Sequence, residues 1–548
     1  MTIKQQASSS FAAALAAGGV EFVTAFPGSP TTTLALYLEA HGAEHGIEFR
    51  WTINENVALS QAFGAAMGGR GAAALMKHVG VNVASDALHV MGVVHGLAAP
   101  LLLVEGADSK PGSSQSAQDN RALYASSPQM LVIGPSAGDE LAECVADACT
   151  ISTAAGMMVV LRGDARCFGD RAEASTPAPV EAHGSPYSAW PGRGFALATS
   201  ARTYAFHLRQ RAEVLRRLEP WIESSWRGQG LDGDASEVLV IAAHIGASAA
   251  ARAQAQGLPY LRLLTEHPLP RAKLEALAAR CETLIVIEEC TPTLEDALAA
   301  LVHRAGLPTR VIGRGALGDT RPIGRLDDAT LDTIFANLGG RGPVDGPAES
   351  RGPRVELDGL FEGLAEQIEA EREAHDAAHP ASGFPKRDLR RQLFALLRGL
   401  RSEVFITVDP GVTGVLALAN HQSDVKMHMG GGVPIAAGWA RARAGQPESL
   451  SVAVVGDTNL PHSEWLGILD AADHGDDLLL VIADNGHSEM TQRIVTPRLS
   501  PAAGVASFEA AGLRCWTADA REASEDDWES VIHEAAAGSG PRLVWLRF

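Results

Sequence analysis

The stretch Val452-Ala453-Val454-Val455-Gly456-Asp457 decides the fold of the C-terminal third of this 548-residue chain. It is typical of a buried strand that ends in a Gly-Asp turn. A helix-like stretch follows at 463–474, and a second apolar run at 478–483 ends in Asp484-Asn485-Gly486. Asn485 follows Gly456 by 29 residues, enough for one strand–helix–strand crossover. Two neighbouring parallel strands would then present Asp457 and Asn485 at the same sheet edge, where open α/β sheets bind ligands.

The side chains at this edge have the chemistry of a metal site. A carboxylate, an amide oxygen and a nearby backbone carbonyl suit Mg²⁺ that is also coordinated by diphosphate oxygens. A Gly-Asp turn followed one crossover later by an Asn turn is similar to the metal–diphosphate motif of thiamine-diphosphate enzymes. The alternative is that Gly-Asp and Asp-Asn-Gly are ordinary turn sequences after strands.

Three glycines upstream of this motif predict a phosphate contact. Gly430, Gly431 and Gly432 precede a helix at 435–443, with Pro434 near its first turn. Backbone N–H groups and the helix dipole at such a start can meet a phosphate. The alternative is a loop whose glycines allow close packing. Together with the Asp457 and Asn485 turns, the phosphate interpretation is favoured.

Composition excludes several classes of protein. The chain is 46% hydrophobic, which excludes wholesale disorder, and 45 Lys and Arg against 65 Asp and Glu give a formal net charge of −20. This acidity argues against a general nucleic-acid binder, which needs a basic face. The apolar runs are strand-sized, so we expect no membrane span, and the polar start at 1–10 does not resemble a signal peptide. The six scattered cysteines contain no Cys-x-x-Cys pattern, which argues against an iron–sulfur cluster in this chain and favours a reducing cytoplasm.

Short apolar runs alternate with helical stretches along most of the chain, which predicts an α/β protein with three doubly wound domains. Stretches at 169–193 and 339–359 are rich in Pro, Gly and charge and interrupt this alternation, as linkers do. A helical period at 204–226 predicts a helix that braces the domains. The predicted boundaries are 1–185 for a first domain, 186–235 for a linker with the bracing helix, 236–338 for a middle domain, 339–385 for a second linker and 386–548 for a third domain.

Glu55 is the second candidate for chemistry. It follows a predicted strand at 49–53 and opens a helix, so it lies at a carboxyl-edge loop. The structural interpretation is an acid at a helix N-terminus with Asn54 as the cap. The functional interpretation is a carboxyl that faces the pyrimidine ring of the cofactor and drives deprotonation of the thiazolium, with its pKa raised by burial.

Several longer phrases together resemble one family. They are Phe26-Pro27-Gly28-Ser29-Pro30, Asn54-Glu55, Met76-Lys77-His78-Val79-Gly80-Val81-Asn82, Ser113-Ser114-Gln115, Gln118-Asp119-Asn120-Arg121, Pro268-Leu269-Pro270, Val286-Ile287-Glu288-Glu289, Gly456-Asp457 with His462-Ser463, and Asp484-Asn485 with Met490-Thr491. In this order they are similar to the α subunit of indolepyruvate:ferredoxin oxidoreductase, within the 2-oxoacid:ferredoxin oxidoreductases. The resemblance covers most of residues 10–491.

The resemblance implies a fold and a set of site residues. The domains would be a pyrimidine-binding domain, a domain like the transketolase C-terminal domain and a diphosphate-binding domain, with thiamine diphosphate between domains of different protomers of a homodimer. Glu55 would activate the pyrimidine, and Mg²⁺ would bind Asp457, Asn485 and the backbone carbonyl of His487. Further cofactor contacts would come from Gly430, Gly431, Gly432, Gly456, Thr458, Asn459 and Met490. Ser29, His78 and Asn82 would contact the substrate, with His78 also catalytic, and His428, His462 and His487 are weaker histidine candidates.

The departures from the family concern electron transfer. Relatives carry a C-terminal domain with two iron–sulfur clusters and a Cys-Pro-Gly-Cys stretch that here reads Ala381-Ser382-Gly383-Phe384, and Thr458 replaces a Gly common in thiamine enzymes. The expected function is cleavage of a 2-oxo acid of the arylpyruvate or indolepyruvate type, with the electron acceptor on a partner subunit. The alternatives are a decarboxylase or carboligase that releases an aldehyde or ketol, and a non-catalytic subunit that binds the cofactor.

Overall fold

The computed structural model describes residues 3–109, 116–126, 129–136, 140–168, 195–196, 201–232, 236–317, 324–338, 350–378, 388–420, 422–521 and 525–548. Three sequence predictions lie outside these residues: the linker at 169–193 with the boundary at 185, the phrase Ser113-Ser114-Gln115, and the stretch at 381–387. Among the described helices, none combines the length and the apolar character that a bilayer span needs.

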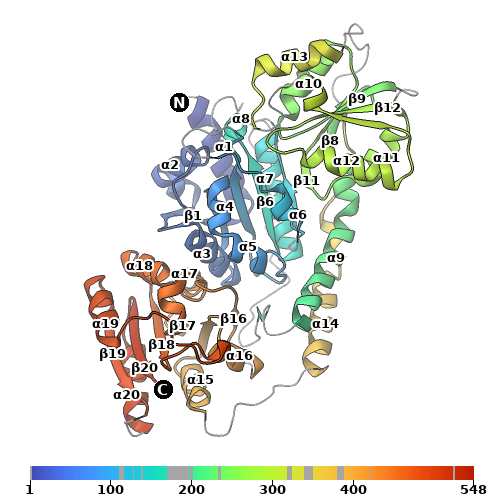
Figure 1. The fold of residues 1–548 in the computed structure, drawn as a ribbon. Coiled ribbons are helices and arrows are strands. Elements are labelled where there is room, and N and C mark those ends of the chain that lie inside the picture. Colours follow the sequence, from blue (N-terminus) through green and yellow to red (C-terminus); the bar gives the residue numbers. More distant parts are fainter. Residues whose placement is uncertain are drawn as a thin grey trace.

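The first domain is built on a seven-stranded sheet with helices on both faces (Figure 1). The strand order is β11-β5-β6-β4-β3-β1-β2, and all pairs are parallel except β11 with β5. The strands are β1 Val20–Ala25, β2 Glu48–Trp51, β3 Gly71–Lys77, β4 Leu101–Gly106, β5 Val132–Ile133, β6 Met158–Gly163 and β11 Thr265–His267. The helices are α1 Ile3–Ala17, α2 Thr32–His41, α3 Glu55–Met67, α4 His78–Val83, α5 Ser85–Met91, α6 Arg121–Ala125, α7 Leu141–Ala155 and α8 Ala165–Phe168. β11 belongs to the middle part of the sequence, so the two domains share this sheet.

The middle domain has a six-stranded sheet with the order β13-β12-β9-β10-β8-β14. Its strands are β8 Trp226–Gln229, β9 Ser236–Ala243, β10 Tyr260–Leu263, β12 Cys281–Ile287, β13 Arg310–Gly313 and β14 Ser350–Arg351. Its helices are α10 Gly246–Ala255, α11 Arg271–Ala278, α12 Thr293–Arg304 and α13 Asp328–Leu338. The central strands are parallel, while β8 runs antiparallel to β10 and β14.

The third domain has a seven-stranded parallel sheet with the order β19-β20-β18-β17-β15-β16-β7. Its strands are β7 Phe195–Ala196, β15 Glu403–Val408, β16 Val425–Lys426, β17 Ser449–Gly456, β18 Leu478–Asp484, β19 Arg514–Asp519 and β20 Arg542–Arg547. Its helices are α15 Leu389–Gly399, α16 Val412–Ala419, α17 Gly432–Ala442, α18 Trp465–Asp473, α19 Pro501–Ala510 and α20 Glu525–Ala537, with a π-helical turn at Leu460–Glu464 before α18.

Two long helices run beside the domains on one side of the molecule (Figure 1). They are α9 Ala201–Ser224 and α14 Leu364–Ala378. Arg217 of α9 donates to the Glu362 carbonyl and to Gln367 of α14. Arg211 of α9 is fully buried and donates to the Gly92 carbonyl, just past the last residue of α5, where the helix dipole favours a cation. The predicted bracing helix at 204–226 therefore docks on the first domain.

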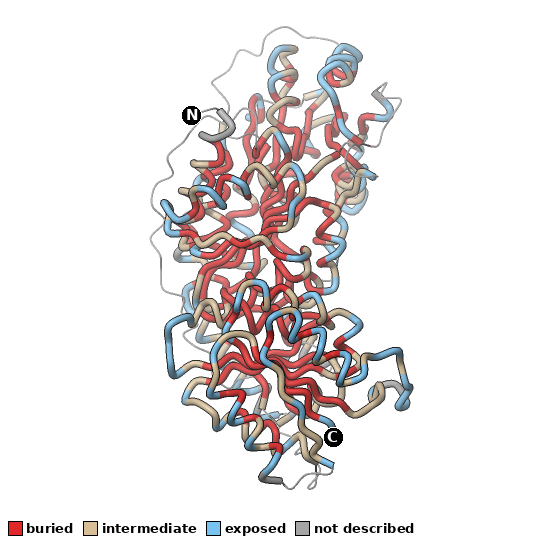
Figure 2. Tube along the Cα trace, turned by 90° about the vertical axis from the view of Figure 1, so that its left-hand side faces the viewer, coloured by how far each residue is buried: buried red, intermediate tan, exposed pale blue. Residues whose placement is uncertain are grey.

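The first and third domains of one chain pack directly on each other through α3 and α17. Gly64 of α3 lies against the Ile435 backbone, and Gly438 of α17 lies against the Gln61 backbone, so a Cβ at either position would collide with the facing helix. Buried residues follow the strands of each sheet and continue across this contact (Figure 2). The first and third domains of one chain therefore contact each other, and the cofactor position between protomers that the family resemblance implies stays a prediction.

The predicted α/β class with three doubly wound domains is confirmed. The predicted boundaries stay a prediction, and three strands lie in segments assigned to linkers. β7 and β8 lie in the first predicted linker and belong to the third and the middle sheet, while β14 lies in the second and extends the middle sheet.

Candidate functional site

The sheets of the first and third domains each have a point at which the strand order reverses. The helices that follow the two strands at this point cover opposite faces of the sheet. In the first sheet this point lies between β1 and β3, and in the third between β15 and β17. Open α/β sheets bind ligands in the crevice at the carboxyl ends of such strands. In the first sheet, Gly28 lies in the loop after β1 and Lys77 is the last residue of β3. The two are so close that a Cβ at Gly28 would collide with the Cβ of Lys77. Asp409 and Asp457 follow the strands at the second point.

Glu55 is the first residue of α3 and lies beside the first of these points. The Asn54 side chain accepts a hydrogen bond from Val57 N at 2.8 Å, so the predicted cap is present. Glu55 is 8% exposed, and its carboxyl lies where a Cβ at Gly80 would be, so a side chain at position 80 would displace this carboxyl. Burial raises the pKa of Glu55, which favours the protonated carboxyl. A raised pKa makes a carboxyl a better proton donor near neutral pH, which suits proton transfer.

Glu55 is flanked by contacts to the third domain. Ile53 N donates to Asp470 Oδ1 at 2.8 Å, and Asn56 Nδ2 donates to the Gly430 carbonyl at 3.4 Å. The side chain of Gln61, one turn along α3, also donates to Asp470. The predicted pyrimidine activator and the predicted glycine loop therefore meet at one interface.

His78 and Asn82 lie on α4, directly after β3. His78 is fully buried, and its backbone carbonyl accepts from Asn120 Nδ2 at 2.8 Å. Burial and the neighbouring Lys77 cation lower the pKa of His78, so its imidazole is neutral at pH 7. Asn82 hydrogen-bonds Gln118 and Asn120. Asn82 Nδ2 also donates to the His78 carbonyl at 3.4 Å, and Ser29 is exposed in the loop after β1, so the three residues share the carboxyl edge of the first sheet.

The two predicted metal ligands are neighbours at the carboxyl ends of β17 and β18. Asp457 N donates to the Ala483 carbonyl at 3.3 Å, and the backbone of Asn485 donates to the Asp457 carboxylate. Burial and the nearby Asp484 carboxylate raise the pKa of Asp457, which is the electrostatic condition that a bound cation would relieve. Asn485 Oδ1 accepts from His487 N at 3.2 Å. A carboxylate, an amide oxygen and backbone carbonyls within one turn fit Mg²⁺ as a donor set.

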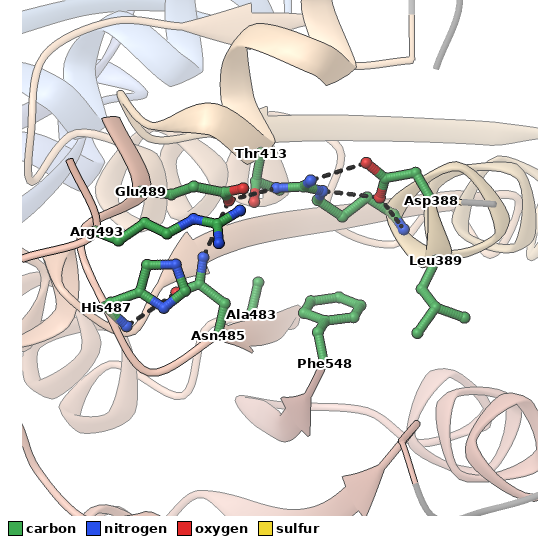
Figure 3. A pocket seen from close by; sticks show the side chains of 10 residues that line it. Asp388, Leu389, Thr413, Ala483, Asn485, His487, Glu489, Arg493 and Phe548 are labelled. Atoms are coloured by element: carbon green, nitrogen blue, oxygen red, sulfur yellow. Dashed lines mark hydrogen bonds and ion pairs between the residues drawn. The ribbon is translucent and has the colours of Figure 1, made fainter. Parts of the chain in front are cut away.

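A pocket of about 480 Å³ opens beside this turn (Figure 3). It is lined by Asp388, Leu389, Arg390, Thr413, Ala483, Asn485, His487, Glu489, Arg493 and Phe548. Arg390 bridges Asp388 and Glu489, and Glu489 accepts from the Asn485 amide at 3.1 Å. Thr413 lies in the first turn of α16, whose backbone N–H groups favour an anion. The residues present therefore fit a diphosphate with its metal.

The glycine loop has a different local role from the predicted one. Gly432 N donates to Asp409 Oδ1 at 3.1 Å and to Glu464 Oε1 at 2.8 Å, and Val433 N donates to Glu464 Oε2 at 3.1 Å. Buried carboxyl groups of the chain thus cap α17, so the N–H of Gly432 is not available to a phosphate. Gly430 has a φ of +88° and packs against Ser463, as the close-packing alternative expects. A cofactor contact of Gly430 and Gly431 stays a prediction.

The remaining predicted residues are spread around the same edge. Asn459 is buried and donates to the Pro410 carbonyl at 2.8 Å, which ties the loops after β15 and β17 together. Gly456 has open space where a side chain would be, and Thr458 is half-buried beside it. Met490 is 59% exposed. His428 is buried behind Gly431, with its pKa lowered to about 4 by burial, while His462 contacts Ser463 at the surface.

Sequence reasoning missed four residues of this site. Asp409 follows β15 as Asp457 follows β17, so the rule of acidic turns at strand ends could have found it. Thr413 follows the turn Asp409-Pro410-Gly411, which is a helix-start signal. Glu464 and Arg498 act through tertiary contacts, and no local pattern marks them.

The chain resembles several known proteins in its sequence. Residues 417–545 match the family model "Thiamine pyrophosphate enzyme, C-terminal TPP binding domain". The chain is 25% identical over 485 residues to indolepyruvate oxidoreductase subunit IorA of Archaeoglobus fulgidus, covering 86% of this chain and 73% of the relative. It is 24% identical to the IorA subunit of Pyrococcus abyssi over the same shares. The solved 2-oxoglutarate:ferredoxin oxidoreductase from Magnetococcus marinus aligns with a TM-score of 0.45 and 15% identity, over 61% of this chain and 64% of that chain.

The fold, the two facing sheet edges and the matched binding domain define a thiamine-diphosphate-dependent enzyme. Within that class the chain is a relative of the IorA subunits of indolepyruvate oxidoreductase, to which six curated proteins at 23–26% identity belong. The resemblance seen in the sequence is thereby confirmed.

Proposed function

We propose that the chain uses thiamine diphosphate and Mg²⁺ to cleave a 2-oxo acid of the arylpyruvate or indolepyruvate type, as one subunit of an oxidoreductase whose electron acceptor lies on a partner. The observation that carries this proposal is the contact of the residues flanking Glu55, Ile53 and Asn56, with the third domain, together with the neighbouring Asp457 and Asn485 turns. The names of the relatives support the substrate class and the subunit character.

The third domain would bind the metal and the diphosphate, and the first domain would supply the proton transfer and the substrate contacts. Asp457, Asn485 and the His487 carbonyl would hold Mg²⁺, and the pocket at Thr413 would hold the diphosphate. When bound, thiamine diphosphate supplies an electron sink for loss of CO₂. Glu55 would hold and release a proton toward the pyrimidine ring, since burial keeps its pKa raised. The neutral His78 would donate a hydrogen bond to the substrate, with Asn82 and Ser29 at the same edge.

The proposal includes three further expectations. The protein works as a homodimer in the cytoplasm, it pairs with a second subunit, and it carries no iron–sulfur cluster of its own.

The middle domain would hold the first domain in place through Arg121, which bonds Glu288 and the backbone of Glu289.

The test uses purified protein with thiamine diphosphate, Mg²⁺ and either indolepyruvate or phenylpyruvate, with and without a viologen dye. CO₂ release that requires the dye is the expected result, because electrons must leave the substrate. Release without dye, with an aldehyde as product, would instead identify a non-oxidative decarboxylase. No release after the partner subunit has been added would reject the proposed substrate class.

A further inference from the structure

A single guanidinium lies between the two strand-end carboxylates of the third domain. Arg498 Nη1 is 3.2 Å from Asp457 Oδ2 and 3.2 Å from Asp484 Oδ1. The two acidic side chains are 4% and 6% exposed, whereas Arg498 is 37% exposed and comes from the segment that leads to α19. The single positive charge of Arg498 thus pairs with the two buried carboxylates of Asp457 and Asp484, at the place where the sequence predicts a divalent cation.

The two carboxylates differ in what else holds them. Asp484 Oδ2 accepts from Trp545 Nε1 at 3.0 Å and lies 4.0 Å from Arg547. For Asp457, Arg498 is the one cationic partner in the described part of the chain. If Arg498 moves away, Asp484 keeps its indole and a cation, while Asp457 is left beside a like charge. Asp457 is therefore the carboxylate that most needs either Arg498 or a metal.

We propose that Arg498 is an internal counter-ion of the metal site, which neutralises Asp457 in the metal-free chain and is displaced when a divalent cation binds that carboxylate. This inference rests on the proposed function, because it takes Asp457 as a metal ligand. A guanidinium and a divalent cation on the same carboxylate repel each other and compete for the same oxygens. Arg498 thereby sets the concentration of metal at which the site fills.

The displacement has a structural consequence for one segment. Residues 486–500 begin at Gly486, whose α-carbon faces the Arg498 guanidinium closely enough that a Cβ would lie 3.1 Å from Nη1. The same segment contains the exposed residues Ile494 and Val495 and directly follows Asn485. Arg390 still pairs with Glu489 when Arg498 moves, so the release of Arg498 loosens the later part of the segment, residues 492–500, beside the pocket.

The experiment compares Arg498→Gln, Arg498→Lys and, as a control, Arg216→Gln on the full chain without thiamine diphosphate. Arg216 is an exposed cation of α9 that pairs with Glu213 and lies outside the pocket lining. Terbium binding is followed by luminescence sensitised by Trp545, and Mg²⁺ affinity is obtained by competition. We expect R498Q to bind Mg²⁺ roughly tenfold more tightly than the wild type, the scale of one charge-assisted contact, R498K to lie between them and R216Q to be unchanged. A Trp545→Phe variant lacks the sensitising indole beside Asp484, so the luminescence that it loses is the part that comes from this site.

Hydrogen exchange gives a second readout that does not depend on activity. Mg²⁺ should increase exchange in residues 492–500 of the wild type and leave R498Q, in which this part of the segment is already released, nearly unchanged. Equal Mg²⁺ affinities of wild type and R498Q would overturn the counter-ion role while leaving the proposed metal site intact. If neither protein binds terbium or Mg²⁺, and an Asp457→Asn variant behaves alike, the metal site of the proposed function fails together with the inference.

Discussion

At the scale of single residues, Glu55 should separate chemistry from binding. Glu55→Gln keeps the shape and the contact with Gly80 but cannot exchange a proton, so we expect unchanged thiamine-diphosphate affinity and a turnover reduced about 100-fold or more. Calorimetric titration measures the affinity, and CO₂ release measures turnover. The exposed Glu44→Gln is the matched control. Full turnover in the Glu55 variant would show that this carboxyl does not act on the cofactor.

The raised pKa of Glu55 also predicts how stability depends on pH. Because its folded pKa lies above the unfolded value of about 4.3, the native chain binds the proton more tightly, and stability falls as the pH rises through that window. Glu55→Gln has no such loss. The melting temperature of the variant relative to the wild type should therefore increase between about pH 4 and pH 7. A difference that is constant across this range would mean that Glu55 is not desolvated.

At the scale of elements, the crossing of α3 and α17 places the two halves of the site. Gly438→Ala and Gly64→Ala would each drive a methyl group into the backbone of the facing helix, so we expect a loss of about 1–3 kcal/mol in the free energy of unfolding. Gly399→Ala at the end of α15 meets open space and should be neutral or slightly stabilising. Urea unfolding compares the three, and wild-type stability in both interface variants would show that the helices do not cross this closely.

At the scale of the whole molecule, a buried ion pair contributes to the contact between the first and third domains. Arg50 bonds Asp476 through both nitrogens, at 2.8 and 3.0 Å, and both side chains are buried. Asp476→Ala leaves a buried unpaired guanidinium, so we expect a cost of about 3–5 kcal/mol and separate calorimetric transitions for the domains. The double variant Arg50→Met with Asp476→Leu should recover much of the loss. A single sharp transition in Asp476→Ala, at the wild-type temperature, would contradict this role.

The features that a local sequence pattern encodes could be predicted, whereas those that depend on contacts between distant residues could not. The strands β17 and β18 are continuous apolar runs with turn residues after them, so both their existence and the pairing of Asp457 with Asn485 could be predicted. β7, β11 and β14 have two or three residues each and pair with strands far away in the chain, so no periodicity marks them. The cap of α17 by Glu464 and the bridge made by Arg498 are likewise decided by tertiary contacts.

The strand β11 has a consequence for how such a chain can be divided or recombined. Although Thr265–His267 follow the middle domain's β10, they close the outer edge of the first domain's sheet against β5, and Glu266 pairs with Arg162 in the interior of that domain at 2.9 Å. A first domain separated from the rest would expose a strand edge and an unpaired buried arginine. The first domain therefore cannot be exchanged between relatives as a continuous stretch of sequence. The exchange would also have to include the three-residue strand β11.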